Sequence, residues 1–175
     1  MKGLSGMMSA GLALAVAAVG CSGKPASSPF GVRLPEPPDG QPVAAAISVQ
    51  PETAAPGSEV LVSVGIRIAA GYHIQGAGPT QGPFQPTGVD LVLPDGFVPV
   101  GGWQMPAPTV TRSGERIYTD AVVFLRRCRV PLDVRPEGVS IAASLHFQAC
   151  NDDVCRPPAT LTLTTPIRVV KKPTR

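Results

Sequence analysis

The chain has 175 residues, of which 43% are hydrophobic and 15% charged, and its formal net charge is +3 at pH 7. Its Lys and Arg residues are scattered and form no basic stripe interleaved with aromatic residues, which argues against a nucleic-acid-binding surface. No Ser-His-Asp order, phosphate loop or nucleotide fingerprint occurs. The sequence therefore predicts no cofactor, no nucleic-acid partner and no evident small-molecule substrate.

The N-terminal residues have the pattern of an export signal. Met1-Lys2 is a short basic start, and Met7 to Val19 is an uncharged apolar run too short to span a bilayer. Small residues then precede Cys21, as in the signal peptides of bacterial lipoproteins, so residues 1–20 are expected to be removed and Cys21 lipidated. This predicts a lipid-anchored protein of the bacterial cell envelope that faces the periplasm. The alternative is ordinary secretion; in both cases disulfides can form and persist.

Composition divides the remaining chain into three parts. Residues 21–42 contain six prolines and predict a semi-rigid tether. Residues 43–170 have the size of one domain with one core, and residues 171–175 form a basic tail. No segment after the signal is long and apolar enough to cross a membrane.

The folded part shows strand periodicity and no helical periodicity. Apolar residues alternate with other residues along Val60–Ile68 and Val139–Phe147, which predicts two half-buried strands. Further strands are expected at Ala45–Gln50, Tyr72–Gln75, Val89–Leu93, Ile117–Leu125, Arg129–Val134 and Leu161–Val169. Short strands separated by turns rich in Gly and Pro predict an all-β, antiparallel β-sandwich, with a closed barrel as the alternative.

Two cysteines at the end of a predicted strand are the main candidates for chemistry. Cys150 and Cys155 lie in an exported chain and are expected to pair. If Leu145 and Phe147 face the core, Cys150 lies on the outer face and is presented to solvent or a partner. A disulfide that closes so small a loop stabilises a fold by only about 2 kcal/mol in the chain-entropy model, so a redox role is the better hypothesis. The alternative is a static hairpin disulfide.

The residues around the pair predict its reactivity. Asp152 and Asp153 should disfavour a thiolate, whereas Arg156 should favour one and so make Cys155 the sulfur that a partner attacks. Cys128 is expected to be a semi-buried free thiol that behaves as a small apolar residue. The alternative is that Cys128 pairs with another chain or with a neighbouring cysteine during exchange.

The two histidines are not expected to take part in the chemistry. His146 shares the predicted face of Cys150, but four strand residues separate them by about 13 Å, too far for a Cys–His pair. Tetrahedral metal sites usually show two pairs of ligands, and the cysteine pair has no second pair to join, even with His73 available. The sequence predicts no metal site.

Six short motifs follow one another along the folded part of the chain. They are Gly71-Tyr72-His73-Ile74, Pro79 to Pro86, Leu91 to Phe97, Met105-Pro106-Ala107-Pro108, Gly114 to Tyr118, and Phe147-Gln148-Ala149-Cys150 continued by Cys155-Arg156-Pro157-Pro158. From about Ala45 to Val170 the chain resembles the periplasmic N-terminal domain of the thiol:disulfide interchange protein DsbD, also called the disulfide-bond corrector domain. The cysteine motif is the most specific part of the resemblance.

The resemblance implies an immunoglobulin-like β-sandwich in which Cys150 and Cys155 form the redox pair. Such a domain takes reducing equivalents from a thioredoxin-like domain and passes them to other thiol proteins of the envelope. A cap loop shields the cysteines in this family, and the corresponding region offers Trp103 or Met105 as the cap.

The membrane-embedded conductor and thioredoxin-like domain of the full family protein have no counterpart in these 175 residues, so a separate reductant is expected. The rival hypothesis is a non-enzymatic immunoglobulin-like binding module with a structural disulfide.

Overall fold

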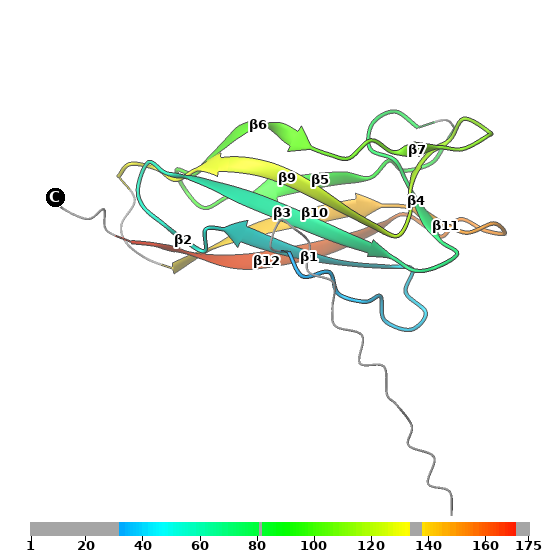
Figure 1. Cartoon of the computed structure of the whole chain (residues 1–175), viewed down its shortest axis with the longest axis horizontal. Coiled ribbons are helices and arrows are strands. Elements are labelled where there is room, and N and C mark those ends of the chain that lie inside the picture. The colour runs from blue at the N-terminus through cyan, green and yellow to red at the C-terminus, as the bar shows by residue number, and fades with distance from the viewer. Residues whose placement is uncertain (1–31, 81, 134–137, 171–175) are drawn as a thin grey trace, which may run out of the picture.

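Two four-stranded sheets make up most of the molecule (Figure 1). The computed structural model describes residues 32–80, 82–133 and 138–170. The first sheet is antiparallel and has the order β1-β3-β9-β6, with β1 at Val43–Gln50, β3 at Glu59–Ile68, β9 at Ala121–Arg129 and β6 at Val98–Gln104.

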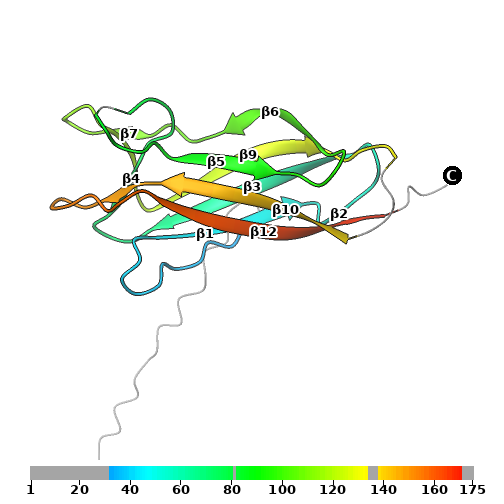
Figure 2. The ribbon, with the colours of Figure 1, turned by 180° about the vertical axis from the view of Figure 1, so that it is seen from behind.

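The second sheet faces the first and has the order β2-β12-β10-β5 (Figure 2). Its strands are β2 at Thr53–Ala54, β12 at Ala159–Val169, β10 at Gly138–Phe147 and β5 at Gly88–Val92. All its pairings are antiparallel except that of β2 with β12. The two sheets form an immunoglobulin-like β-sandwich, which confirms the predicted fold class and not the barrel.

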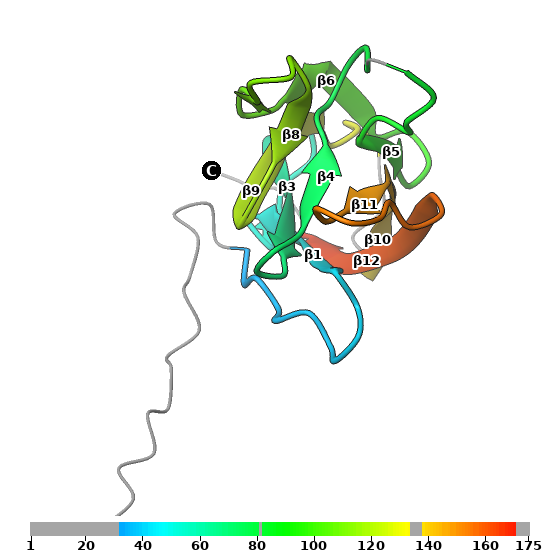
Figure 3. The ribbon, with the colours of Figure 1, turned by 90° about the vertical axis from the view of Figure 1, so that its right-hand side faces the viewer.

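A third, smaller sheet lies at one end of the sandwich (Figure 3). Its order is β11-β4-β8-β7, with β11 at Ala149–Cys150, β4 at His73–Gln75, β8 at Arg116–Tyr118 and β7 at Thr109–Val110. Among the described residues no helix is long and apolar enough to span a membrane.

The core between the sheets follows the predicted alternation. The five apolar residues of one β3 face, from Val60 to Ile68, are all buried, and so are Leu145 and Phe147 of β10. One cluster of the core continues to Ile74 of β4 and Ala149 of β11, so the small sheet is packed onto the sandwich. The hydrophobic effect thus helps to hold the end sheet against the sandwich.

Two strand predictions are wrong for reasons of backbone geometry. The expected strand Ile117–Leu125 is divided between β8 and β9, because Asp120 adopts a positive φ of 59° and turns the chain from one sheet to another. The expected strand Arg129–Val134 does not continue beyond Arg129 within the described residues, where Pro131 removes a hydrogen-bond donor.

An unexpected strand, β6, contains Pro99 and the Gly101-Gly102 pair. It lies at the edge of its sheet and its register with β9 shifts between Val100 and Gln104. Edge strands with bulges tolerate these residues, which is why a composition rich in Pro and Gly hid the strand.

The described part of the predicted tether packs on the domain. Val32 and Leu34 are 1% and 8% exposed. They lie over Gly65 of β3, where an added Cβ would clash with Leu34 Cδ2. Residues 32–42, called the strap below, therefore belong to the folded unit, whereas residues 21–31 lie outside the described part of the chain.

Replacing Leu34 by Ala should lower the free energy of unfolding by about 2 kcal/mol, because the substitution leaves a cavity over Gly65. Leu132→Ala is the matched control, because Leu132 is 83% exposed and its truncation should change little. Urea unfolding of a form that begins at Ser22 measures both variants, and equal effects would show that the strap is not packed in solution.

Candidate functional site

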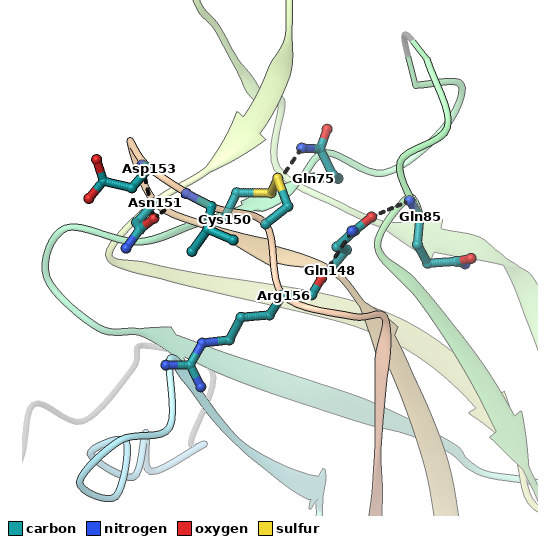
Figure 4. The surroundings of a disulfide bond; sticks show 9 residues. Gln75, Gln85, Gln148, Cys150, Asn151, Asp153 and Arg156 are labelled. Carbon is teal, nitrogen blue, oxygen red and sulfur yellow. Dashed lines mark hydrogen bonds between the residues drawn. A yellow bond between two sulfur atoms is a disulfide. The ribbon is translucent and has the colours of Figure 1, made fainter.

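A tight hairpin, Ala149–Arg156, carries the two candidate cysteines at the end of the sandwich (Figure 4). Cys150 and Cys155 form a disulfide. Asn151 Oδ1 accepts hydrogen bonds from the backbone N–H groups of Asp153 (3.1 Å) and Val154 (2.8 Å), and the Arg156 N–H donates to the Ala149 carbonyl (2.8 Å). The hairpin, called the disulfide hairpin below, is thus closed by hydrogen bonds as well as by sulfur.

Cys150 is buried, which corrects the prediction that it lies on the exposed outer face. Its exposed fraction is 2%, and that of the preceding Ala149 is 1%. The alternation along β10 ends at Phe147, and after Gln148 the chain joins the end sheet, where Cys150 pairs with His73 of β4. Cys155 is only half-buried, so the two cysteines are unequally exposed.

Gln148 occupies the break between β10 and β11. Its side-chain Oε1 accepts a hydrogen bond from the Gln85 backbone N–H at 2.9 Å, and its Nε2 donates to the Arg156 carbonyl at 3.0 Å. A side-chain amide can satisfy one donor and one acceptor at once, as it does here. Gln148 therefore joins both ends of the disulfide hairpin to the loop before β5.

Gln75 is a residue of the site that the sequence analysis missed. Its side chain is buried, with the residue 2% exposed, and its Nε2 lies 4.0 Å from Cys150 Sγ (Figure 4). The register of β11 on β4 explains this position: His73 is opposite Cys150, and Gln75, two residues on, lies on the same face. The sequence contains no signal for this register.

Arg156 is bound away from the sulfurs. Its Nη1 donates to the Gly40 carbonyl of the strap at 2.9 Å, and its Nη2 donates to the Tyr72 hydroxyl at 3.1 Å. The guanidinium carbon also lies 5.4 Å from the centre of the Tyr72 ring, a cation–π distance. In Figure 4 the side chain extends away from the disulfide, so these contacts link the hairpin to the strap.

The structure separates the two cap candidates, and it places Trp103 elsewhere than predicted. Trp103 packs against the core, its Nε1 donates to the Val89 carbonyl at 2.9 Å, and Arg126 lies over its ring. These contacts make it a residue of the sandwich. Met105 is 38% exposed in the loop after β6, which the Tyr118 hydroxyl holds by donating to the Pro106 carbonyl at 2.9 Å.

The other titratable residues take different positions. Asp152 and Asp153 are exposed at the tip of the disulfide hairpin. His146 contacts Thr160 and Asp90 across the sheet, at 2.9 Å each, and takes no part in the cysteine site. Within the described parts of the chain, no three His, Cys, Asp or Glu residues form a group that would hold a metal ion.

Cys128 is a free thiol, as predicted, and is fully buried in the core. Burial raises the pKa of its thiol, and the nearby positive charge of Arg126 only partly opposes this effect. A buried thiol with a raised pKa is a poor nucleophile and is not expected to exchange with the pair.

Comparison with known proteins identifies relatives at the level of family and fold. The family model described as "Thiol:disulfide interchange protein DsbD, N-terminal" matches residues 41–166. A search of curated proteins gives no match.

The solved structures that are similar to this chain include two N-terminal domains. The N-terminal periplasmic domain of ScsB from Proteus mirabilis has a TM-score of 0.50 and 16% identity, over 73% of this chain and 47% of that one. The chain thus spans about half the length of that structure. The reduced DsbD N-terminal domain of Neisseria meningitidis has a TM-score of 0.39 and 18% identity, over 65% of this chain and 84% of that one.

After the disulfide is reduced, Cys128 should react with iodoacetamide much more slowly than Cys155. Its raised pKa and complete burial lower both its thiolate fraction and its access, whereas Cys155 is half-buried. Mass spectrometry of the native protein at pH 8 measures the two rates, and a urea-unfolded sample is the control in which both should react alike. Rapid native labelling of Cys128 would contradict this account of its environment.

Proposed function

Because this chain belongs to the family of the N-terminal domain of the thiol:disulfide interchange protein DsbD, we propose that it passes reducing equivalents between envelope proteins through Cys150 and Cys155. A thioredoxin-like protein supplies these reducing equivalents, and other thiol proteins of the envelope receive them. The unequal exposure of the two cysteines supports this proposal most directly: Cys150 is 2% exposed, whereas Cys155 is half-buried at the end of the domain.

Exchange proceeds by attack of a thiolate on one sulfur of a disulfide. A partner thiolate attacks Cys155 Sγ, a mixed disulfide forms, and Cys150 leaves as a thiolate. A second partner thiolate then attacks the partner sulfur of the mixed disulfide and releases Cys155. The partner ends as a disulfide and this domain as a dithiol. The reverse sequence, with the disulfide of another envelope protein, returns the domain to its oxidised form.

The choice of Cys155 as the attacked sulfur rests on access. Attack requires approach along the S–S bond, and the buried Cys150 offers a partner no such approach. The exposed Asp152 and Asp153 repel negative charge from the hairpin tip, which disfavours small anionic thiols such as glutathione relative to a docked protein. Met105 remains the candidate for a cap residue.

The disulfide should open reversibly at a mild potential and faster with reduced thioredoxin than with glutathione at equal thiol concentration. Alkylation and mass spectrometry of Cys150 and Cys155, in a Cys128→Ala background beginning at Ser22, follow the equilibrium and the rate. Labile disulfides have potentials less negative than about −300 mV. A bond that opens only when the domain unfolds would contradict exchange and favour the rival, a binding module with a structural disulfide.

We also propose that Cys21 is lipidated and anchors the domain to a membrane of the envelope; this residue lies outside the described part of the structure. In Cys21→Ser the modification site is lost, so the protein should move from the membrane fraction to the released fraction of a bacterial host. Ser22→Ala is the neighbouring control and should stay in the membrane fraction. Identical fractionation of the parent and Cys21→Ser would refute the anchor.

A further inference from the structure

The exchange proposed above, on which this inference rests, leaves negative charge on a buried atom. When a partner attacks Cys155, the electron pair of the S–S bond passes to Cys150 Sγ, in a residue that is 2% exposed. A thiolate in such surroundings loses most of its hydration, and burial alone raises the pKa of a thiol and slows its departure. Some group of the protein must therefore replace the missing water.

The charged neighbours of the hairpin do not supply that group. Arg156 donates to Gly40 and Tyr72 and extends away from the sulfurs (Figure 4). Asp152 and Asp153 have the wrong sign and lie at the exposed tip. His73 is the cross-strand neighbour of Cys150, and no hydrogen bond from its ring to the sulfur occurs among the described contacts.

The donor that does reach Cys150 is the side chain of Gln75. Its Nε2 lies 4.0 Å from Sγ, the long end of the range for a hydrogen bond to sulfur, and the residue is 2% exposed. A hydrogen bond to a sulfur of a neutral disulfide is weak. Such contacts often shorten when negative charge develops on the acceptor. The geometry suits a group that acts when the bond breaks.

The backbone of Gln75 is fixed on both sides. Its N–H donates to the Gln148 carbonyl at 3.3 Å, and its carbonyl accepts a hydrogen bond from the Thr87 hydroxyl. The preceding Ile74 is fully buried in the core. A donor held in this way needs little rearrangement when charge appears, which is the condition under which a dipole stabilises a reacting anion best.

We propose that Gln75 is a catalytic residue of the exchange, whose amide N–H donates to the Cys150 thiolate as it leaves. The electron pair of the S–S bond comes to rest on Cys150 Sγ, and the new bond joins Cys155 Sγ to the partner sulfur. No proton moves in this step, because Gln75 is neutral and keeps both its amide protons. In the reverse direction the same contact keeps Cys150 ionised and ready to attack the mixed disulfide.

The first test measures Cys150 by itself. In a Cys155→Ser, Cys128→Ala background with 13C-labelled cysteine, the Cβ shift of Cys150 is followed against pH by NMR. Gln75→Leu should lower the thiolate-to-thiol ratio about ten-fold at a given pH, because one hydrogen bond to a charged group is lost. Gln75→Glu keeps the shape but places negative charge beside the sulfur, and should lower the ratio further.

The matched control is Gln85→Leu. Gln85 is exposed, its backbone N–H, which the substitution keeps, binds Gln148, and its side chain donates to the neighbouring Pro86 carbonyl, so this variant should leave Cys150 unchanged. Circular dichroism checks that every variant is folded. If Gln75→Leu does not fold, Gln75→Met replaces it, because this side chain is of similar length and also lacks the amide donor.

The second test measures the reaction with dithiothreitol, in the Cys128→Ala background with both other cysteines present. Gln75→Leu should slow opening of the disulfide about ten-fold at constant pH, in line with the loss of one hydrogen bond to the leaving thiolate. An unchanged titration of Cys150 in Gln75→Leu and Gln75→Glu would overturn the proposal, even if the rate fell, because the effect on rate would then be structural.

Neither test uses a partner protein. Failure of thioredoxin to speed the exchange, together with a shifted Cys150 titration, would refute the proposed function alone. Rapid exchange with thioredoxin and an unshifted titration would refute the role of Gln75 alone.

Discussion

The side chain of Gln148 makes the contact on which the site depends. At this residue the chain leaves β10 of the sandwich and joins β4 of the end sheet, so the regular ladder of backbone hydrogen bonds is interrupted. The amide group bridges the gap by binding the Gln85 N–H and the Arg156 carbonyl. The contact with the Gln85 N–H is exposed and the one with the Arg156 carbonyl is partly buried, so the bridge acts mainly by positioning the disulfide hairpin against the loop before β5. The change of sheet in turn places Cys150 beside β4.

Hydrogen bonds and core packing hold the disulfide hairpin in addition to its disulfide. The Asn151 side chain caps the turn, Ala149 and Arg156 are hydrogen-bonded across it, and Ala149 is anchored in the core. The bond itself closes a loop so short that it contributes only about 2 kcal/mol in the chain-entropy model. On this estimate, opening the bond removes little of what holds the hairpin, as the proposed exchange would require.

The sequence predicted the features that depend on local pattern and missed those that depend on register. Alternating apolar residues located β3 and β10, and the cysteine motif identified the pair and the family. The exposed position predicted for Cys150 was wrong because a period of two holds only within one strand, and Gln148 ends that strand. Gln75 was not found because it meets Cys150 only through pairing of segments 75 residues apart. Trp103 was proposed as a cap because of its aromatic ring, but its indole packs against the core and donates to the Val89 carbonyl.

The smallest fragment of the chain that keeps this site intact includes the strap, residues 32–42. Proline content suggested that the folded domain begins at residue 43, but Val32 and Leu34 cover Gly65, and the Gly40 carbonyl holds Arg156, the residue after Cys155. Removing residues 32–42 would expose that face of β3 and deprive the guanidinium of one of its two oxygen partners. The guanidinium would keep its contacts with Tyr72 but lose its link to the strap. A domain cut at residue 43 would therefore lack one of the contacts that hold Arg156, the neighbour of Cys155, away from the sulfurs.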